Sequence, residues 1–379
     1  MNYRKNQLSI FSFQSLLIAF KNCKKGKRFK HETSNFEFNL EENLLKLETE
    51  LNIKIWQPKK VHRFIILEPK PREIIAATFR DRVVHHAIHS QINPLFEKRF
   101  IYDSYANRKD KGTLRAGLRL KQFICKITKN YTKPAFYLKG DVKSYFSTID
   151  HELLFMIIKE TVKDKDILFV IKTIIENKAT GLENFKLSPF DPTFKKSLLL
   201  QPKNKGLPIG NLTSQLFANV YLDKLDHFVK EKLGARFYIR YVDDFVILDT
   251  SKEKLKFFAE EIKNFLDKNL KETLHPKKLK ILPLSYGIDF LGYYFKNQTI
   301  YVRYGNVKRF KHRLIELADL YQKNKVTERY ICDSINAWYS YARHADSYNL
   351  RKHLFIEHAK PFHSFLEPKD DYKYFKLKP

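Results

Sequence analysis

Two adjacent aspartates place the strongest constraint on how this chain can fold. Asp243 and Asp244 lie within the stretch IRYVDDFVIL, with apolar and β-branched residues on both sides of them. Such runs around a short polar step are typical of a hairpin of buried strands, although an Asp pair is also common at hairpin tips because Asp tolerates turns. Two like charges that lose water together are unfavourable unless a cation or a proton neutralises them. The stretch therefore predicts a buried hairpin whose charged tip needs a positive partner.

The chain of 379 residues is strongly basic. It carries 71 Lys and Arg against 42 Asp and Glu, so the formal net charge is 71 − 42 = +29 and the isoelectric point is about 9.7. This excess favours a polyanionic partner, nucleic acid foremost, over a merely solvated basic surface. Some of the 32 Phe and 21 Tyr are candidates for stacking on bases, although most are expected in the core.

Cysteine usage and hydropathy exclude other classes of protein. Cys23, Cys125 and Cys332 are far apart and form no C-x-x-C pair, so neither a zinc site nor a disulfide framework is indicated. No apolar run approaches the ~18 residues of a membrane span, and the basic N-terminal stretch has no small-residue cleavage site. We therefore expect a cytoplasmic protein that does not enter a membrane.

The spacing of apolar residues predicts an α+β protein. The expected helices are an amphipathic one within residues 1–30 followed by a charged loop, residues 35–52, a helix from about Phe79, one from near Ser147 or Thr148, one after Gly210 with Asn211 or Thr213 as its cap, and residues 252–270. Strands are expected at Phe64–Leu67, near Ile74, over the hairpin 236–250 and over 288–295. Residues 184–206 are expected to form a connection or a short hairpin, and the chain from about Asn306 is helix-rich and basic. Because no βαβ rhythm repeats, we expect a central α+β sheet domain between a mixed N-terminal module and a helical C-terminal one.

Asp141 is a third candidate carboxylate for the same site. Asp141, in AFYLKGDVKSYF, stands where a strand gives way to a turn. Carboxylates from two chain-distant strand ends can meet at one edge of a sheet, and two Mg²⁺ ions held there would clamp the attacking and leaving oxygens of a phosphoryl transfer. Mg²⁺ prefers a few carboxylates together with water and substrate phosphates. Bound metal would remove the repulsion between the paired charges.

The sequence around these three carboxylates resembles a known family, the bacterial reverse transcriptases. YVDD is similar to their active-site hairpin, LKGDVKSYFSTIDH to the segment with their first catalytic Asp, and GLPIGNLTSQLFANVYLDKLDHF to their template- and primer-gripping helix. Four further blocks follow the family's order: PKPREIIAATFRDRVVHHAI, FEKRFIYDSYANRKDKGT, LHPKKLKI and GIDFLGYYF. The resemblance spans roughly residues 60 to 295, and INAWYSYARHADSYN extends it weakly into the helical tail.

The resemblance implies a right-hand polymerase fold with fingers, a palm of antiparallel sheet with helices, and a helical thumb. The implied divisions are an N-terminal helical extension at 1–60, fingers at 61–135, palm at 136–180 and 210–295, a fingers–palm connection at 181–209, a helical thumb at 296–365 and a C-terminal tail at 366–379. The basic thumb helices would follow the duplex backbone through phosphate contacts.

The resemblance also implies roles for residues around the carboxylates. Asp141, Asp243 and Asp244, with the backbone carbonyl of Val142, would bind two Mg²⁺ ions, for which Mn²⁺ can substitute. Phe146 matches the aromatic steric gate that occupies the space of a ribose 2′-hydroxyl. The alternative for Phe146 is a core position in a short apolar turn.

Basic residues are implied to bind the nucleotide. Lys70 and Arg72 match the fingers residues that grip the triphosphate, and Lys278 matches a lysine near the leaving pyrophosphate, a candidate proton donor. Lys277 and Lys280 are alternatives to Lys278. In a protein this basic, each of these residues is alternatively a plain surface charge.

The resemblance also implies contacts with template or primer, and the block GNLTSQ bears on which lineage of the family the chain resembles. Arg108, Gly210 and Ser214 are implied to contact template or primer. Where intron and retroviral enzymes carry Ser-Pro or a similar pair, this chain has Ser214-Gln215, as in diversity-generating retroelements and related defence-associated lineages. In the former, the Gln lies near the nascent base pair and is tied to error-prone copying of adenines. A helix-surface amide is the alternative for Gln215.

The implied activity is RNA-directed DNA polymerisation from an RNA or DNA primer with deoxynucleoside triphosphates, in a diversity-generating retroelement. A first alternative is an antiphage defence enzyme that uses a dedicated non-coding RNA or no ordinary template. A second is an inactive RNA-binding or splicing-assistance protein, which predicts decayed carboxylates. No nuclease cluster follows the thumb, which argues against an intron enzyme with its own endonuclease. A structured RNA or a small accessory protein is a further expected partner.

Overall fold

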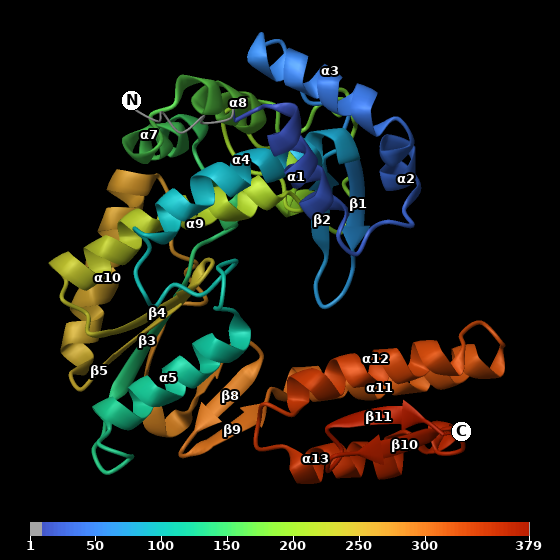
Figure 1. Cartoon of the computed structure of the whole chain (residues 1–379). Helices are drawn as coiled ribbons and strands as arrows, with labels where there is room; N and C mark the ends of the chain where they lie inside the picture. The colour runs from blue at the N-terminus through green and yellow to red at the C-terminus, as the bar shows by residue number, and fades with distance from the viewer. Residues whose placement is uncertain (1–9, 379) are drawn as a thin grey trace, which may run out of the picture. The chain divides into compact units, whose positions relative to one another are not determined.

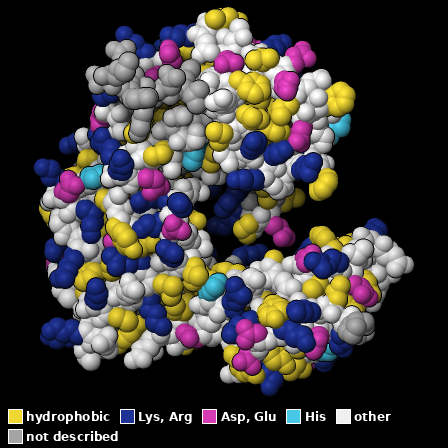
Figure 2. Space-filling view, in the orientation of Figure 1, with side chains coloured by type: hydrophobic (Ala, Val, Ile, Leu, Met, Phe, Trp, Pro, Cys, Tyr) yellow, Lys and Arg dark blue, Asp and Glu magenta, His cyan; other side chains and the backbone are white. Residues whose placement is uncertain are grey.

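The computed structural model describes residues 10–378, which divide into two compact units. The first unit takes in the chain up to Asp110, Lys139–Val246 and Lys256–Lys280, and the second takes in Lys111–Leu138, Ile247–Leu255 and the chain from Ile281. Lys and Arg side chains are spread over the face shown in Figure 2, as the net charge of +29 requires. Within residues 10–378, no helix combines the length and the apolar character needed to cross a membrane.

Three helices open the first unit: α1 (Phe13–Lys24), α2 (His31–Phe38) and α3 (Leu40–Asn52). The helix expected within residues 1–30 is α1, and the part of that stretch before residue 10 lies outside the described residues. The single helix expected over 35–52 is wrong, because Asn39 leaves the helical region at φ −112° and ψ 48° and separates α2 from α3. Asn competes with helical hydrogen bonding and so favours such breaks.

A β-hairpin follows, made of β1 (His62–Ile66) and β2 (Arg72–Ala76). Within residues 184–206 the described chain contains 3₁₀ turns, η1 (Phe194–Lys196) and η2 (Leu198–Leu200), and no strand, so the connection is confirmed and the short hairpin is not. Arg63 in β1 ties this connection to the hairpin, because its guanidinium donates to Glu73 at 2.8 Å and to Asp191 at 2.7 Å.

The core of the first unit is helical. Its helices are α4 (Phe79–Glu97), α6 (Tyr145–Thr148), α7 (His151–Thr161), α8 (Lys165–Glu176), α9 (Leu212–His227) and, from Lys256 onward, α10 (Lys252–Leu270). α4 and α9 run side by side (Figure 1). The helix expected from near Ser147 begins instead at His151, because the Asp150 side chain caps it by accepting from the Leu153 N–H at 3.0 Å. Asn211 precedes α9 as expected, but its side chain accepts from the Ala77 N–H at 3.1 Å.

A four-stranded sheet has the order β4-β5-β3-β6. Its strands are β3 (Phe136–Asp141), β4 (Phe237–Tyr241), β5 (Asp244–Asp249) and β6 (Lys280–Pro283). The β4–β5 hairpin confirms the strands expected over 236–250. Gly140 allows β3 to approach β5, because a Cβ at this position would lie 2.3 Å from the Phe245 ring. The sheet therefore sets the end of β3 beside the hairpin tip.

The second unit contains α5 (Thr113–Ile127) and a three-stranded sheet of β7 (Ile288–Phe290), β8 (Tyr293–Lys296) and β9 (Thr299–Val302). The single strand expected over 288–295 is wrong. Leu291 and Gly292 both have positive φ, 52° and 87°, and form the turn that folds β8 back on β7. α5 lies in this unit, although the implied fingers division contains it.

The C-terminal part of this unit is built from α11 (Tyr304–Gln322), α12 (Glu328–Ala342) and α13 (Tyr348–His353), which confirms the expected helix-rich segment. Residues 366–379 were expected to form a C-terminal tail, but most of them form regular structure packed on this unit. β10 (Leu366–Lys369) and β11 (Tyr374–Leu377) form an antiparallel hairpin. Leu366 and Phe375, 1 % and 2 % exposed, belong to the helical core.

Candidate active site

The paired aspartates lie at the tip of the β4–β5 hairpin, as expected. Val242, the residue before them, has φ +57°, a left-handed conformation that is strongly disfavoured for a β-branched side chain. Strained backbone of this kind persists only where the surroundings enforce it, and it gathers at functional sites. The Val242 carbonyl accepts from Arg240 Nη1 at 2.8 Å, which stabilises the turn.

The structure brings Asp141 to this tip. The backbone N–H of Val142 donates to the Asp243 carbonyl at 3.3 Å, which links the end of β3 directly to the hairpin turn. On its other side the same segment pairs with the chain after α10, since the His275 N–H donates to the Asp141 carbonyl at 2.8 Å and Val142 forms a β-bridge with Leu274. The carboxylate-bearing segments are thus held together by backbone contacts.

The electrostatics of the tip are those of crowded, desolvated acids. Burial, and after it the nearby charge of Asp141, raise the pKa of Asp243 to about 6. Burial raises the pKa of Asp244 to about 7, against the opposing effect of Lys139, while Asp243 and Asp141 add to the rise. All three carboxylates therefore lie within electrostatic range of one another.

Two lysines supply positive charge to this cluster. Lys278 Nζ lies 2.8 Å from both carboxylate oxygens of Asp141, and Lys139 Nζ lies 3.3 Å from Asp244 Oδ2. The other oxygen, Asp244 Oδ1, is buried and has no hydrogen-bond partner. A buried acceptor without a donor is unfavourable unless a water molecule or an ion binds it.

The donor set fits Mg²⁺. In the described part of the chain, no three His, Cys, Asp or Glu side chains are grouped tightly enough to enclose an ion by themselves. Mg²⁺ does not need three protein ligands, because it binds one or two carboxylates and keeps water or substrate phosphates as its other ligands. The carboxylates at this edge are hard oxygen donors, and the buried Asp244 Oδ1 is one acceptor that still lacks a partner.

Phe146 lies in α6, one turn beyond Asp141. Its ring is half-buried and packs edge-on against Tyr145, with ring centroids 5.8 Å apart. Its carbonyl accepts from the Leu207 N–H at 2.6 Å. The backbone is therefore fixed while part of the ring stays accessible, an arrangement compatible with a steric gate.

Of the two cations expected from the β1–β2 hairpin, Lys70 and Arg72, the structure places Arg72 near the carboxylate cluster. Arg72 opens β2, and its charge lies close enough to lower the pKa of Asp243. Lys70 is exposed in the loop between the strands. The structure thus brings Arg72 and Lys278 to the carboxylates.

The residues expected to contact template or primer differ in exposure. Gly210 has φ +126°, which L side chains rarely adopt, and a Cβ there would be 2.9 Å from the Ile74 side chain, so backbone conformation and packing together account for glycine. Ser214 is 2 % exposed, whereas Gln215 is half-buried in the first turn of α9. Neither Gly210 nor Ser214 gains support for a template contact from these positions.

Arg108 is a packing residue in this structure. Its side chain is 7 % exposed. The guanidinium donates to Glu97 at 2.9 Å and to the carbonyls of Ile101 and Ser104 at 2.7 and 2.9 Å. The expected contact with the template has no support in these bonds.

Two residues of the site were missed from the sequence. Lys139 precedes Asp141 by two positions, so strand alternation places both on one face of β3, a signal that was available. Arg240 is a charged residue inside an apolar strand, which could have marked it as a buried cation with a partner.

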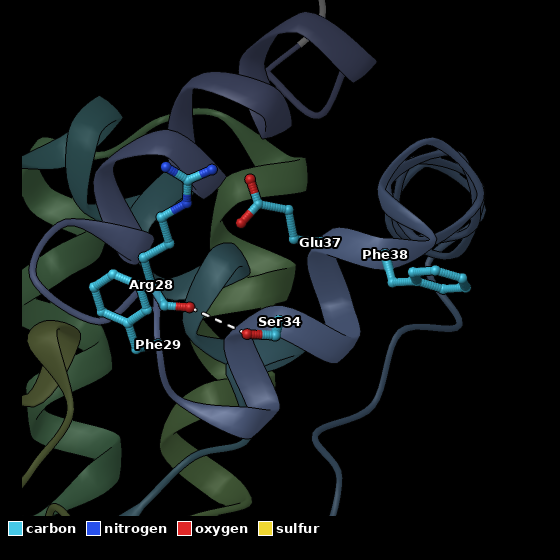
Figure 3. Close-up of a pocket in the computed structure, with 5 residues that line it drawn as sticks. All are labelled: Arg28, Phe29, Ser34, Glu37 and Phe38. Atoms are coloured by element: carbon cyan, nitrogen blue, oxygen red, sulfur yellow. Dashed lines mark hydrogen bonds between the residues drawn. The ribbon is translucent and has the colours of Figure 1, made fainter.

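A separate shallow pocket lies at the N-terminal helices. It is lined by Arg28, Phe29, Ser34, Glu37 and Phe38, and the Ser34 hydroxyl donates to the Arg28 carbonyl at 3.1 Å (Figure 3). No residue of the carboxylate cluster lines this pocket. It is therefore not part of the candidate active site.

Acidic hairpin tips that meet a third carboxylate on a palm sheet are the mark of nucleotidyl-transfer polymerases, and the chain falls in that class. Residues 58–295, more than half of the chain, match the family described as reverse transcriptase (RNA-dependent DNA polymerase). The chain belongs to this family and has its right-hand polymerase fold.

Relatives of known sequence agree with this assignment. Protein YkfC of Escherichia coli K12 is 25 % identical over 272 residues, covering 63 % of this chain and 67 % of its own length. The group II intron-encoded protein LtrA of Lactococcus lactis subsp. cremoris is 24 % identical over 334 residues, covering 71 % of this chain and 51 % of its own. This chain thus spans about half the length of LtrA. Neither name refers to a diversity-generating or defence system, so that finer assignment stays a prediction.

A solved structure of apo telomerase from Candida tropicalis, truncated from its C-terminal domain, is also similar. It has a TM-score of 0.46 and 15 % sequence identity, and the match covers 63 % of this chain and 54 % of that one.

Proposed function

We propose that this chain is an active RNA-directed DNA polymerase that extends an RNA or DNA primer on an RNA template. The observation that carries the proposal is the meeting of Asp141 with the Asp243–Asp244 tip, where burial raises the pKa of both tip carboxyls. A protein that only binds RNA has no use for three crowded acids, which destabilise the fold in the absence of a cation. Their retention supports catalysis over the splicing-assistance alternative.

Asp141, Asp243, Asp244 and the Val142 carbonyl would hold two Mg²⁺ or Mn²⁺ ions, whose chemistry is to lower the pKa of the primer 3′-hydroxyl and to balance the charge of the leaving pyrophosphate. The protein's own cations complete the site. Lys278, whose side chain is 48 % exposed, can leave Asp141 and donate a proton to the pyrophosphate. Arg72 and Lys70 bind the negative triphosphate.

The nucleotide sugar is selected by shape. Phe146 lies in α6, the short helix that follows the end of β3 at Asp141, so its ring would lie against the sugar of the incoming nucleotide. A ribose 2′-hydroxyl would then overlap the ring, whereas a 2′-deoxyribose would fit. The product of such a site is DNA.

Primer extension on an RNA oligonucleotide with Mg²⁺ and the four deoxynucleotides tests the activity. The rate of primer extension by the Asp243→Asn variant should fall below about a thousandth of the wild-type rate, because the substitution removes charge at the reaction centre. Asp249→Asn is the matched control, since Asp249 ends β5, the strand that begins directly after Asp243, and pairs with Lys254 at 3.2 Å. Equal rates for wild type and Asp243→Asn would contradict the proposal.

We further propose that copying is error-prone at template adenines, as in a diversity-generating retroelement. The support is the Ser214-Gln215 pair at the start of α9, where Gln215 is half-buried and Ser214 is buried. Gln215→Ala should lower misincorporation opposite adenine and leave errors opposite the other bases unchanged. An unchanged error spectrum would remove this support.

The same pair also favours the defence-associated alternative, in which a dedicated non-coding RNA or no ordinary template is used. Gene neighbourhood separates the two contexts. A template and variable repeat pair with a small accessory gene supports the retroelement, and phage-defence partners support the alternative.

A further inference from the structure

Arg240 is a charged residue in the middle of an apolar strand, and its side chain is completely buried, 0 % exposed. Its guanidinium binds the Asp226 carboxylate through two parallel bonds, Nε to Oδ1 at 2.7 Å and Nη2 to Oδ2 at 2.6 Å. The Tyr238 hydroxyl donates to Asp226 Oδ1 as well, at 2.6 Å. This two-pronged geometry leaves the guanidinium no freedom to rotate.

The remaining arm of the guanidinium reaches the catalytic turn. Arg240 Nη1 donates to the Val242 carbonyl at 2.8 Å. Val242 has the unfavourable positive φ, and Asp243 and Asp244 follow it directly. The direction in which the Asp243 and Asp244 side chains point therefore depends on the backbone conformation of Val242, which Arg240 stabilises.

Arg240 is in turn held from the other side by residues 103–105. Its N–H donates to the Asp103 carbonyl and its carbonyl accepts from the Tyr105 N–H, each at 3.0 Å. Ser104 forms an isolated parallel bridge with Arg240, and Arg240 Nη2 lies 3.3 Å from the Ser104 hydroxyl. The strand and this loop thus act as one framework around the guanidinium.

Two further residues complete the framework. Asn219 of α9 accepts from Arg240 Nη1 at 3.4 Å and donates to the Ala106 carbonyl at 2.7 Å. Arg108 binds the Ser104 carbonyl from the opposite side. The conformation of the loop that carries Arg108 is therefore linked to Arg240, which gives this block a role that does not involve the template.

A buried ion pair adds little net stability compared with apolar residues of the same shape, because desolvation offsets the attraction. The Arg240–Asp226 pair is thus better explained by the geometry it imposes. We propose that Arg240 is a positioning residue of the reaction centre, which fixes the Val242 turn and thereby aims Asp243 and Asp244 at the metals. This inference rests on the proposed polymerase function.

Two variants test this. Arg240→Lys keeps a positive charge for Asp226 but cannot bind Asp226 and Val242 together. The combined variant Arg240→Met, Asp226→Leu and Tyr238→Phe removes both members of the ion pair together with the hydroxyl that binds Asp226. Binding of Mn²⁺ to the metal-free protein, followed by electron paramagnetic resonance, reports the geometry of the turn independently of activity, and primer extension separates kcat from KM.

Both variants should bind Mn²⁺ about ten- to a hundredfold more weakly and lose a similar factor in kcat, with KM for deoxynucleotides nearly unchanged. Arg80→Lys is the matched control, because Arg80 is 13 % exposed and also binds two carboxylates, Glu50 and Asp81, in the same unit. It should leave Mn²⁺ affinity unchanged.

Mn²⁺ affinity and kcat within about twofold of wild type in either folded variant would overturn the proposal. Loss of the native melting transition in both variants would assign Arg240 to folding and would equally reject it. If the wild type binds Mn²⁺ but does not extend primers, the polymerase function fails while the positioning role is still decided by affinity.

Discussion

At the scale of single residues, the charged groups at the tip of the hairpin carry the chemistry. Asp141 and Asp244 each have a lysine partner, whereas Asp243 is only influenced at a distance by Lys278 and Arg72. Its carboxyl therefore has no cation in direct contact. Its replacement therefore reports on stability as well as on activity.

Asp243→Asn should stabilise the metal-free protein at pH 8 by about 1–2 kcal/mol. The pKa of Asp243 is raised to about 6 in the folded protein, so the folded state binds the extra proton and its stability falls as pH rises from about 4 to about 6. Urea unfolding in chelator at several pH values checks this, and the gain should shrink towards pH 4. A variant less stable than wild type at pH 8 would contradict the assigned burial, and added Mn²⁺ should stabilise wild type more than the variant.

Phe146→Ala should admit ribonucleotides. Removal of the ring opens the space for a 2′-hydroxyl, so the ratio of ribonucleotide to deoxynucleotide incorporation should rise by about tenfold or more. Single-nucleotide extension with matched ribo- and deoxynucleoside triphosphates measures it. Unchanged sugar selectivity would support the alternative in which Phe146 is a core residue.

At the scale of elements, the β10–β11 hairpin shows how a short segment completes a core. Phe375 packs against Tyr339 and Phe355, with ring centroids 4.7 and 4.8 Å apart. Asn336 of α12 donates to the Phe375 carbonyl at 2.9 Å and accepts from its N–H at 2.7 Å. The hairpin is therefore a structural part of the second unit.

Phe375→Ala should destabilise the second unit by about 3–5 kcal/mol, because it leaves a cavity among aromatic rings. Tyr374→Ala, at the neighbouring exposed position, is the control and should change stability by less than about 0.5 kcal/mol. Thermal unfolding followed by circular dichroism compares the two. Similar melting temperatures for both variants would show that the hairpin is not part of the core.

At the scale of the whole molecule, a net charge of +29 dominates encounters with nucleic acid. Lys and Arg are spread over the face shown in Figure 2, so many phosphates can be contacted at once. Affinity from such contacts comes largely from the release of counterions.

Binding to an RNA of arbitrary sequence should therefore fall by about a hundredfold or more between about 50 and 200 mM salt. Filter binding at several salt concentrations gives the slope of the logarithm of affinity against the logarithm of salt. An affinity independent of salt would mean that phosphate contacts contribute little. Asp243→Asn, which removes a single charge, should leave the slope nearly unchanged.

The amino-acid sequence by itself determined the local patterns and the family. The hairpin around Asp243 and Asp244, the long helices and the seven ordered blocks depend on the spacing of neighbouring residues, and such spacing is written in the chain. A charge inside an apolar strand, as at Arg240, signals a buried partner but does not say which one.

Tertiary structure decided what depends on residues far apart in the chain. Asp226 becomes a partner of Arg240 only when α9 packs on the sheet, and Arg108 turns inward because Glu97 and two carbonyls surround it. The hairpin after Leu366 was missed for the same reason. Local propensity is weak at these positions, and burial against distant helices and strands provides the free energy that selects the conformation.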